Sequence, residues 1–391
     1  MRPLRILAAA AATAVAAAAL AAVASAPPAA AAGFAQVGNF GSNPGNLAMY
    51  EYVPPALSPS PAVVVAMHGC TQTATAYYQN SGWPKYADRH GFVVVFPEQR
   101  TANNSNRCFN WFQPGDATRD QGEALSIRQM VGSAVSRHGG GRVFVTGLSA
   151  GGAMTAVLLA QYPDLFAGGS VVAGLPAGCA TDVASAFTCM NPGVDRTPAQ
   201  WAQAVRAGGR PRVAIWHGTS DTTVVPRNAD ELRDQWTAVH GISTTPTSTG
   251  SLPGPTRRET YGSGQVQVYR VQGMGHGTPV DPGGATDQCG ATAAYFLDFV
   301  CSSYHTAVFW GLTGGSTPTP TATPTSTPPA GATCHEGSNY EHVQAGRATT
   351  RYGYVYAVGS GQAMGLYNTW VRHTLRQSPP GYYTVADAGC P

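Results

Sequence analysis

The chain has 391 residues and a formal net charge of +3, and only 11% of its residues are charged. Its single lysine is Lys85. Such a weakly charged chain has no electrostatic basis for binding nucleic acid or an anionic membrane surface. Its length accommodates one large domain and one small one.

The first 32 residues have the pattern of a secretory signal peptide. Arg2 and Arg5 precede a run of Ala, Val and Leu, and the small residues at 30–32 form a cleavage site before Gly33. The run is mostly alanine and breaks at Pro27, which disfavours a membrane anchor. Loss of the two arginines lowers the net charge from +3 to +1. We therefore expect a secreted, extracellular protein whose eight cysteines can form disulfides.

Apolar runs alternate with helical patterns over most of the chain. A hairpin is expected over residues 36–52. Buried strands are expected at 62–67, 92–96, 143–145, 170–173, 213–216 and 266–271. Helices are expected at 116–138, after the N-cap Thr197, at 228–240 and at 291–300. This alternation predicts an α/β fold with a mainly parallel sheet covered on both faces. In such sheets the chemistry lies in loops at the carboxyl ends of strands.

The composition divides the chain into parts. Residues 33–310 carry the α/β pattern and form the predicted catalytic domain. Residues 311–333 are a linker in which Thr and Pro alternate, as in an extended spacer. Residues 334–391 form a small module, expected to be all-β, and a disulfide between Cys334 and Cys390 would help to stabilise so small a core.

The stretch Gly147-Leu-Ser-Ala-Gly151 fits G-x-S-x-G between a buried strand and a helix. This context is that of a nucleophile elbow, a turn so tight that residues two positions either side of the serine cannot carry a Cβ atom. The pattern predicts Ser149 as nucleophile. The N–H of Ala150, at the start of the following helix, is a predicted oxyanion donor.

A serine nucleophile needs a base and a carboxylate that orients it. In the order Ser…Asp…His of the hydrolases, Asp221 follows the strand at 213–216 and His276 follows the strand at 266–271. These two residues are the predicted partners of Ser149. His217 precedes Asp221 in the same loop and is interpreted as a support for that loop. His240 lies at a helix end and is interpreted as a cap.

The second oxyanion donor is predicted in the loop that follows the strand at 62–67. There His68, Gly69 and Cys70 form the predicted oxyanion loop, with the Cys70 N–H as donor. Cys70 and Cys108 each follow a buried strand by a short loop, which predicts a disulfide between them. This bridge would fix the segment with Trp111, a predicted substrate contact.

Two further pairings follow from spacing and elimination: Cys179 with Cys189, and Cys289 with Cys301. The chain has no H-E-x-x-H motif or paired C-x-x-C motif, so no metal is expected.

The terminal module is rich in tyrosine. Tyr352, Tyr354 and Tyr356 share one face of a predicted strand because side chains alternate along it. That face is either the core side of a small sheet or part of a binding surface. With Trp370, these residues are the predicted binding residues of the module, because aromatic surface in so small a segment indicates an interaction site.

With these residues in place, the chain resembles the secreted poly(3-hydroxybutyrate) depolymerases whose oxyanion loop precedes the lipase box. The stretches that carry the resemblance are His68-Gly-Cys-Thr-Gln72, Cys108-Phe-Asn-Trp-Phe112, Gly147-Leu-Ser-Ala-Gly-Gly-Ala-Met154, Trp216-His-Gly-Thr-Ser-Asp-Thr-Thr-Val224 and Gly273-Met-Gly-His-Gly-Thr-Pro-Val-Asp-Pro282. The terminal module is similar to the polymer-binding module of that family through Ser338-Asn-Tyr340, Ala345-Gly-Arg-Ala348, Met364-Gly-Leu-Tyr-Asn-Thr369 and Thr374-Leu-Arg-Gln377. The short Thr/Pro spacer departs from members that carry a folded module at that place.

The resemblance implies an α/β-hydrolase fold and an extracellular serine esterase that cleaves a short-chain polyhydroxyalkanoate without a cofactor. It implies an insoluble polyester surface as the partner, and we expect a monomer. The catalytic part is also similar to feruloyl and acetylxylan esterases, so a plant cell-wall ester is an alternative substrate. A secreted serine peptidase and an adhesion protein with a vestigial triad are further alternatives.

Overall fold

The structure is a computed structural model that describes residues 32–314, 333–351, 354–377 and 380–387. The predicted signal peptide and most of the predicted linker lie outside these ranges, and their roles stay predictions. None of the helices within the described ranges combines the length and the apolar character needed to cross a membrane. The catalytic domain and the terminal module are described separately below.

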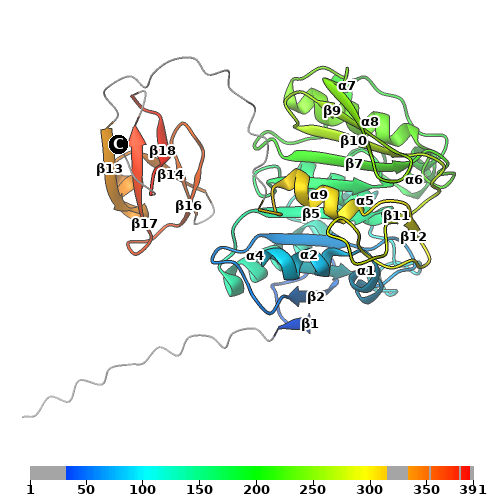
Figure 1. The fold of residues 1–391 in the computed structure, drawn as a ribbon, viewed down its shortest axis with the longest axis horizontal. Helices are drawn as coiled ribbons and strands as arrows, with labels where there is room; N and C mark the ends of the chain where they lie inside the picture. The colour runs from blue at the N-terminus through cyan, green and yellow to red at the C-terminus, as the bar shows by residue number, and fades with distance from the viewer. Residues whose placement is uncertain (1–31, 315–332, 352–353, 378–379, 388–391) are drawn as a thin grey trace, which may run out of the picture. The chain divides into compact units, whose positions relative to one another are not determined.

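The catalytic domain is built on a ten-stranded sheet in the order β1-β2-β4-β3-β5-β6-β7-β10-β9-β8. In Figure 1 the order runs from β1 at the bottom of the view to β9 near the top. The strands are β1 (Gly33–Val37), β2 (Ala48–Val53), β3 (Val63–Met67), β4 (Val93–Glu98), β5 (Val143–Leu148), β6 (Gly168–Val172), β7 (Arg212–Gly218), β8 (Ser248–Leu252), β9 (Thr256–Tyr261) and β10 (Val266–Val271). From β4 to β10 the neighbouring strands are parallel, as predicted. The flanking pairs are antiparallel, including the predicted opening hairpin.

Helices cover both faces of this sheet. They are α1 (Ala74–Asn80), α2 (Trp83–His90), α3 (Pro114–Ala117), α4 (Gly122–His138), α5 (Ala150–Gln161), α6 (Val183–Met190), α7 (Pro198–Ala202), α8 (Arg227–His240) and α9 (Ser302–Trp310). Val63, Val65 and Met67 of β3 pack in one core cluster with α4, α5, α7 and α8. Val64 and Ala66 point to the other face and pack with α1, α2 and α9. This division follows from the alternation of side chains along a strand.

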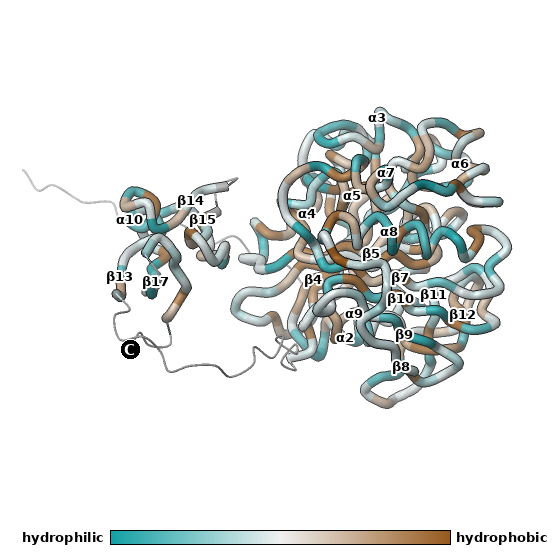
Figure 2. The backbone as a smooth tube through the Cα atoms, turned by 90° about the horizontal axis from the view of Figure 1, so that it is seen from above, coloured by the Kyte–Doolittle hydropathy of each residue, from teal (hydrophilic) through white to brown (hydrophobic). Residues whose placement is uncertain are grey.

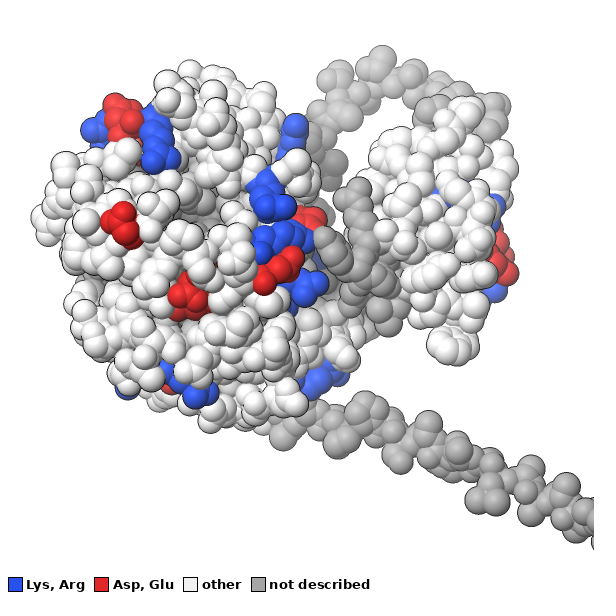
Figure 3. Space-filling view, turned by 180° about the vertical axis from the view of Figure 1, so that it is seen from behind, with Lys and Arg blue, Asp and Glu red and all other residues white. Residues whose placement is uncertain are grey.

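The distribution of polarity agrees with this layered core. Brown, hydrophobic segments concentrate in the central strands in Figure 2, and teal segments lie toward the periphery. The face drawn in Figure 3 is largely white, with few charged side chains, in keeping with a chain that has 11% charged residues.

The prediction of a helix at 291–300 is wrong. The segment contains the short strand β12 (Phe296–Asp298), which pairs in parallel with β11 (Thr278–Val280), and the helix α9 begins only at Ser302. The disulfide between Cys289 and Cys301 explains the difference, because it holds their Cα atoms 5.3 Å apart over twelve positions. A helix of that length would separate them by about 18 Å.

The sequence patterns also missed a hairpin and a helix. The hairpin of β8 and β9 lies at the edge of the sheet, and β8 is exposed and polar, so it lacks the apolar alternation of a half-buried strand. Helix α6 has only eight residues and includes Cys189, which is bonded to Cys179 before the helix.

The terminal module consists of two three-stranded antiparallel sheets and one short helix. Its elements are β13 (Thr333–Ser338), α10 (Asn339–Gln344), β14 (Ala348–Arg351), β15 (Tyr354–Ala357), β16 (Ala363–Leu366), β17 (Arg372–Gln377) and β18 (Tyr383–Val385). The predicted β module is therefore confirmed, with α10 as an addition. Its buried core is small and comprises Ala348, Val355, Ala357, Met364 and Leu375.

The tyrosine pattern in β15 is partly described. Val355 and Ala357 are buried in the module core, whereas Tyr356 between them is half-buried. Because side chains alternate along a strand, Tyr356 lies on the face opposite to this core. Tyr352 lies outside the described residues, and the side chain of Tyr354 is not described.

Candidate active site

Ser149, the predicted nucleophile, lies in the sharp turn between β5 and α5. Its φ and ψ angles are 56° and −117°, a conformation that is strained for a residue with a Cβ atom. A Cβ atom on Gly147 would lie 2.4 Å from the carbonyl oxygen of Gly151, and one on Gly151 would lie 2.5 Å from that of His68. The two glycines are therefore required for this turn, as the sequence pattern predicts.

His276 and Asp221 are brought together from two different loops. His276 lies in the loop between β10 and β11, Asp221 lies in the loop after β7, and His276 Nδ1 is 2.7 Å from Asp221 Oδ2. The other carboxylate oxygen of Asp221 accepts hydrogen bonds from the backbone N–H groups of Thr223 and Val224, both at 2.9 Å. These bonds fix the carboxylate, which is 2% exposed, in an orientation that can hold the imidazole.

His217 supports this loop, as predicted. Its side chain is buried, and Nε2 is 2.8 Å from the carbonyl oxygen of Val224. Burial lowers the pKa of His217, so the ring is neutral at neutral pH. His217 Nε2 also lies 3.7 Å from Asp221 Oδ2, behind the carboxylate that contacts His276. The predicted cap His240 is half-buried, with Nε2 2.9 Å from the carbonyl oxygen of Pro211.

A cavity of about 450 Å³ joins the predicted catalytic residues. Ser149, His276, Ala150, Cys70 and Trp111 all line it. As the first residue of α5, Ala150 has an N–H group without an acceptor inside the helix, so this donor is available at the base of the cavity. The cavity therefore places a hydroxyl, an imidazole and candidate backbone donors around one space.

The His68 side chain is buried behind the predicted oxyanion loop and does not line the cavity. It is fully buried, with Nδ1 2.7 Å from the carbonyl oxygen of Gly69 and Nε2 accepting the N–H of Gln99 at 3.1 Å. Burial lowers the pKa of His68 to about 4, so the ring is neutral at neutral pH. The bond to Gly69 orients the peptide plane that it shares with the Cys70 N–H. The His68 side chain therefore lies outside the cavity lining and positions the predicted oxyanion loop through Gly69.

The disulfides predicted in the catalytic domain are confirmed. They join Cys70 to Cys108, Cys179 to Cys189 and Cys289 to Cys301. The first ties the predicted oxyanion loop to the segment with Trp111, and the N–H of the neighbouring Asn110 donates to the buried Glu123 at 2.9 Å. Cys390 lies outside the described residues, so its pairing with Cys334 stays a prediction.

Sequence patterns missed several cavity residues. Val183 and Phe187 reach the cavity from α6, and Tyr295 reaches it from the loop before β12. The Tyr295 ring meets the His276 ring edge-on, with 6.2 Å between their centroids. The only signal in the sequence for α6 was the Cys179–Cys189 pair, and Tyr295 lies in the segment wrongly predicted as a helix.

In the module, Trp370 is the most exposed large apolar side chain of the described residues, at 85%. Nearby, the rings of Tyr340 and Tyr367 lie 5.6 Å apart, and both side chains are exposed. Tyr340 donates its N–H to the carbonyl oxygen of Asn368, whose side chain accepts the N–H of Trp370. These three exposed aromatic residues thus lie on neighbouring, hydrogen-bonded segments and are defined here as the aromatic patch. Among the described residues there is no group of three or more His, Cys, Asp or Glu side chains that could hold a metal ion.

The fold and its relatives define the chain as a carboxylic ester hydrolase with an α/β-hydrolase catalytic domain. The sequence profile described as "Esterase PHB depolymerase" matches residues 46–261, and the chain belongs to this family. It is 52% identical over 291 residues to poly(3-hydroxyalkanoate) depolymerase C of Paucimonas lemoignei. This match covers 71% of this chain and 70% of that protein.

More distant relatives include a feruloyl esterase B of Talaromyces funiculosus. That enzyme is 36% identical over 278 residues, which cover 67% of this chain and 78% of its own. Among solved structures, an acetyl xylan esterase from Aspergillus awamori has a TM-score of 0.58 and 34% identity, and the match covers 62% of this chain and 93% of that one. The catalytic domain is thus shared with esterases of different substrates.

Proposed function

We propose that the protein is an extracellular depolymerase that hydrolyses the ester bonds of poly(3-hydroxybutyrate) or related short-chain polyhydroxyalkanoates. The contact between His276 and Asp221, on a cavity that also contains Ser149, is the observation that carries the reaction. The 52% identity to a poly(3-hydroxyalkanoate) depolymerase supports the substrate.

In the proposed mechanism, Ser149 Oγ attacks the carbonyl carbon of an ester while His276 takes its proton. Asp221 holds the imidazole through Nδ1 and stabilises its charged form. The N–H groups of Cys70 and Ala150 donate to the oxyanion. His276 then gives its proton to the departing alkoxide, which leaves as a new hydroxyl chain end. Water, deprotonated by His276, then attacks the acyl carbon, the bond from that carbon to Ser149 Oγ breaks, and His276 returns the proton to Ser149 Oγ.

The terminal module is proposed to adsorb to the solid polymer. The aromatic patch supports this role, because exposed aromatic rings suit an apolar surface and tyrosine hydroxyls can donate to ester carbonyls. Trp111 is proposed as a substrate contact within the cavity. Adsorption would raise the concentration of ester bonds near Ser149.

Secretion is proposed from the sequence of the first 32 residues, and the three disulfides of the catalytic domain are in keeping with an oxidising environment. We propose a monomer, because one chain provides all residues of the proposed triad.

A direct comparison of substrates tests the proposal. The purified full chain is incubated at equal concentration with poly(3-hydroxybutyrate) granules and with feruloylated, acetylated xylan. We expect soluble 3-hydroxybutyrate products from the granules and little ferulate or acetate from xylan. The reverse result would replace the polyester by a cell-wall ester, a candidate favoured by the similarity to feruloyl and acetyl xylan esterases.

A further inference from the structure

Helix α6 presents large apolar side chains to solvent beside the catalytic cavity. Val183 is 55% exposed and Phe187 is 65% exposed, and both line the cavity that contains Ser149. They are four positions apart and therefore lie on the same side of the helix. Tyr295, 45% exposed, lines the same cavity. We define these three side chains as the apolar rim.

The exposed large apolar side chains of the catalytic domain are concentrated at the apolar rim and are not evenly distributed over the surface. Within the described part of the catalytic domain, the large hydrophobic side chains that are exposed are Leu57, Val183, Phe187, Tyr295 and Val308. Three of these five belong to the rim, so such residues gather at the catalytic cavity. Exposed apolar surface that is continuous with a binding cavity indicates that a ligand extends beyond the cavity.

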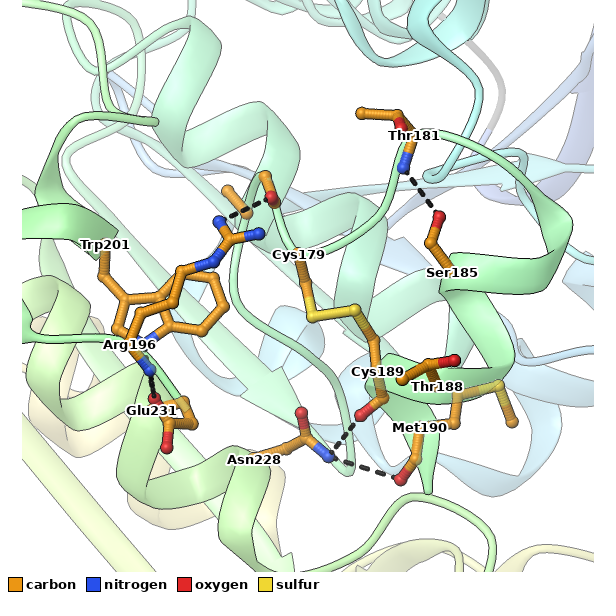
Figure 4. Close-up of a disulfide and its surroundings, with 12 residues drawn as sticks. Cys179, Thr181, Ser185, Thr188, Cys189, Met190, Arg196, Trp201, Asn228 and Glu231 are labelled. Carbon is orange, nitrogen blue, oxygen red and sulfur yellow. Dashed lines mark hydrogen bonds between the residues drawn. A yellow bond between two sulfur atoms is a disulfide. The ribbon is translucent and has the colours of Figure 1, made fainter. Parts of the chain in front are cut away.

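Helix α6 is held rigidly in place. The disulfide of Cys179 and Cys189 joins the segment before the helix to its last turn, and Asp182 and Ser185 form a capping box at its start. At the other end, Asn228 of α8 donates to the carbonyl oxygens of Cys189 at 3.0 Å and Met190 at 3.4 Å (Figure 4). The helix that carries Val183 and Phe187 is therefore held in place without a ligand, which reduces the entropy lost on binding.

The polar groups of α6 are used inside the helix. The hydroxyl of Ser185 donates to the carbonyl oxygen of Asp182, and that of Thr188 donates to the carbonyl oxygen of Ala184. The exposed side of the helix thus offers hydrocarbon and an aromatic ring. A polysaccharide, whose hydroxyls need hydrogen-bond partners, would lose hydrogen bonds to water on this surface. A neutral polyester repeat has ester oxygens as acceptors but no hydrogen-bond donor, and its methyl and methylene groups suit this surface, so it would lose fewer hydrogen bonds.

We infer that the apolar rim is a subsite for the polyester repeats next to the ester that is cleaved. This inference rests on the proposed function. The chain segment that leaves the cavity packs its methyl groups against Phe187 and Val183 and thereby keeps the scissile carbonyl near Ser149. The rim adds affinity only for substrates that are longer than the cavity itself.

The test uses the full chain with soluble substrates, which do not depend on adsorption to a solid. kcat/KM is measured for methyl esters of 3-hydroxybutyrate dimer, trimer and tetramer and for p-nitrophenyl acetate. For the V183S/F187S variant we expect the ratio of the tetramer value to the acetate value to fall about tenfold, since apolar contacts of one or two groups change specificity by this order. F187L, which keeps the apolar surface, should retain most of the wild-type ratio.

The matched control is V308S, because Val308 is an exposed apolar residue on a helix of the same domain but does not line the cavity. Its ratio should equal that of the wild type. An unchanged ratio in V183S/F187S, or an equal loss on all substrates together with a lower unfolding temperature, would overturn the subsite. If the wild-type chain hydrolyses none of the oligomers but does hydrolyse xylan esters, the proposed function itself is wrong.

Discussion

The catalytic domain and the terminal module expose aromatic side chains in different settings. In the catalytic domain the exposed Phe187 and Tyr295 surround a cavity, and a disulfide, a capping box and Asn228 hold the helix that carries Phe187. In the module Tyr340 lies on α10, Tyr367 and Trp370 lie in the loop before β17, and the described buried core is small.

This difference fits a division of the proposed function between the two regions, with hydrolysis in the catalytic domain and adsorption in the module. A reaction needs its groups held to within a fraction of an ångström, which requires a deep core and buried hydrogen bonds such as those around Asp221. Adsorption to a polymer needs only apolar area at the surface, which a small β module can supply. The two regions should therefore fail independently when they are altered.

The largest expected effect breaks the reaction and leaves adsorption intact. Ser149→Ala and His276→Ala should each lower kcat for soluble p-nitrophenyl esters by about 10⁴-fold or more, because each removes a member of the proposed triad. Circular dichroism and thermal unfolding check that the variants are folded, and a pull-down with granules checks adsorption. A folded Ser149→Ala protein with near wild-type turnover would disprove the assignment of the nucleophile.

The next largest expected effect removes adsorption and leaves the reaction on soluble esters intact. Truncation after Thr313 should preserve kcat/KM for soluble esters and lower the erosion rate of polyhydroxybutyrate films by about 10²-fold at low enzyme concentration, because the local concentration of substrate is lost. Film erosion is followed by turbidity or mass loss. Equal erosion by the truncated and full chains would show that the module has another role.

A smaller effect is expected from a single substitution that tests where the proposed adsorption surface lies. Trp370→Ala should weaken binding of the full chain to granules by about tenfold, since a well-exposed aromatic anchor contributes on the order of 1–2 kcal/mol to an apolar contact. The binding isotherm is measured by depletion from solution. Tyr382→Ala alters a tyrosine of the module with 41% exposure and serves as the matched control. If both variants weaken binding equally, adsorption is spread over the module rather than centred on the aromatic patch.

A prediction of a different kind concerns stability in acid. Burial lowers the pKa of His305 in α9 to about 4, and no protein acceptor or donor is found for its Nε2 within the described residues. Between pH 6.5 and 4 the unfolded chain binds a proton at this residue and the folded chain does not. The free energy of unfolding therefore decreases as the pH is lowered, by up to about 1.4 kcal/mol per pH unit.

His305→Phe should therefore reduce the acid sensitivity of the catalytic domain. Urea unfolding at pH 7 and at pH 4.5 measures the free energy difference for both proteins, with Val308→Ala on the same helix as control. A pH dependence that is as steep in His305→Phe as in the wild type would contradict a buried, neutral histidine.

The turn at Ser149 shows what local sequence can determine. A strand of Val and Phe, two glycines that leave space for the turn and a following helix are all encoded within fifteen residues, and the strained backbone at Ser149 follows from them. The parallel strands were predictable for a similar reason, since strands buried on both faces are continuously apolar. The Cys70–Cys108 bridge followed from the ends of these strands.

The tertiary structure alone decided features that depend on residues far apart in sequence. The segment 291–300 has the composition of a helix, yet the Cys289–Cys301 bridge and the pairing of β11 with β12 force it into a loop that carries Tyr295 to His276. Likewise, the sequence near α6 does not indicate that Phe187 lies at the cavity. Local patterns indicated the buried parallel strands, the long helix α4 and the tight turn at Ser149, because these depend mainly on neighbours along the chain. Which side chains meet around Ser149 depends on packing between segments, and no local pattern contains that information.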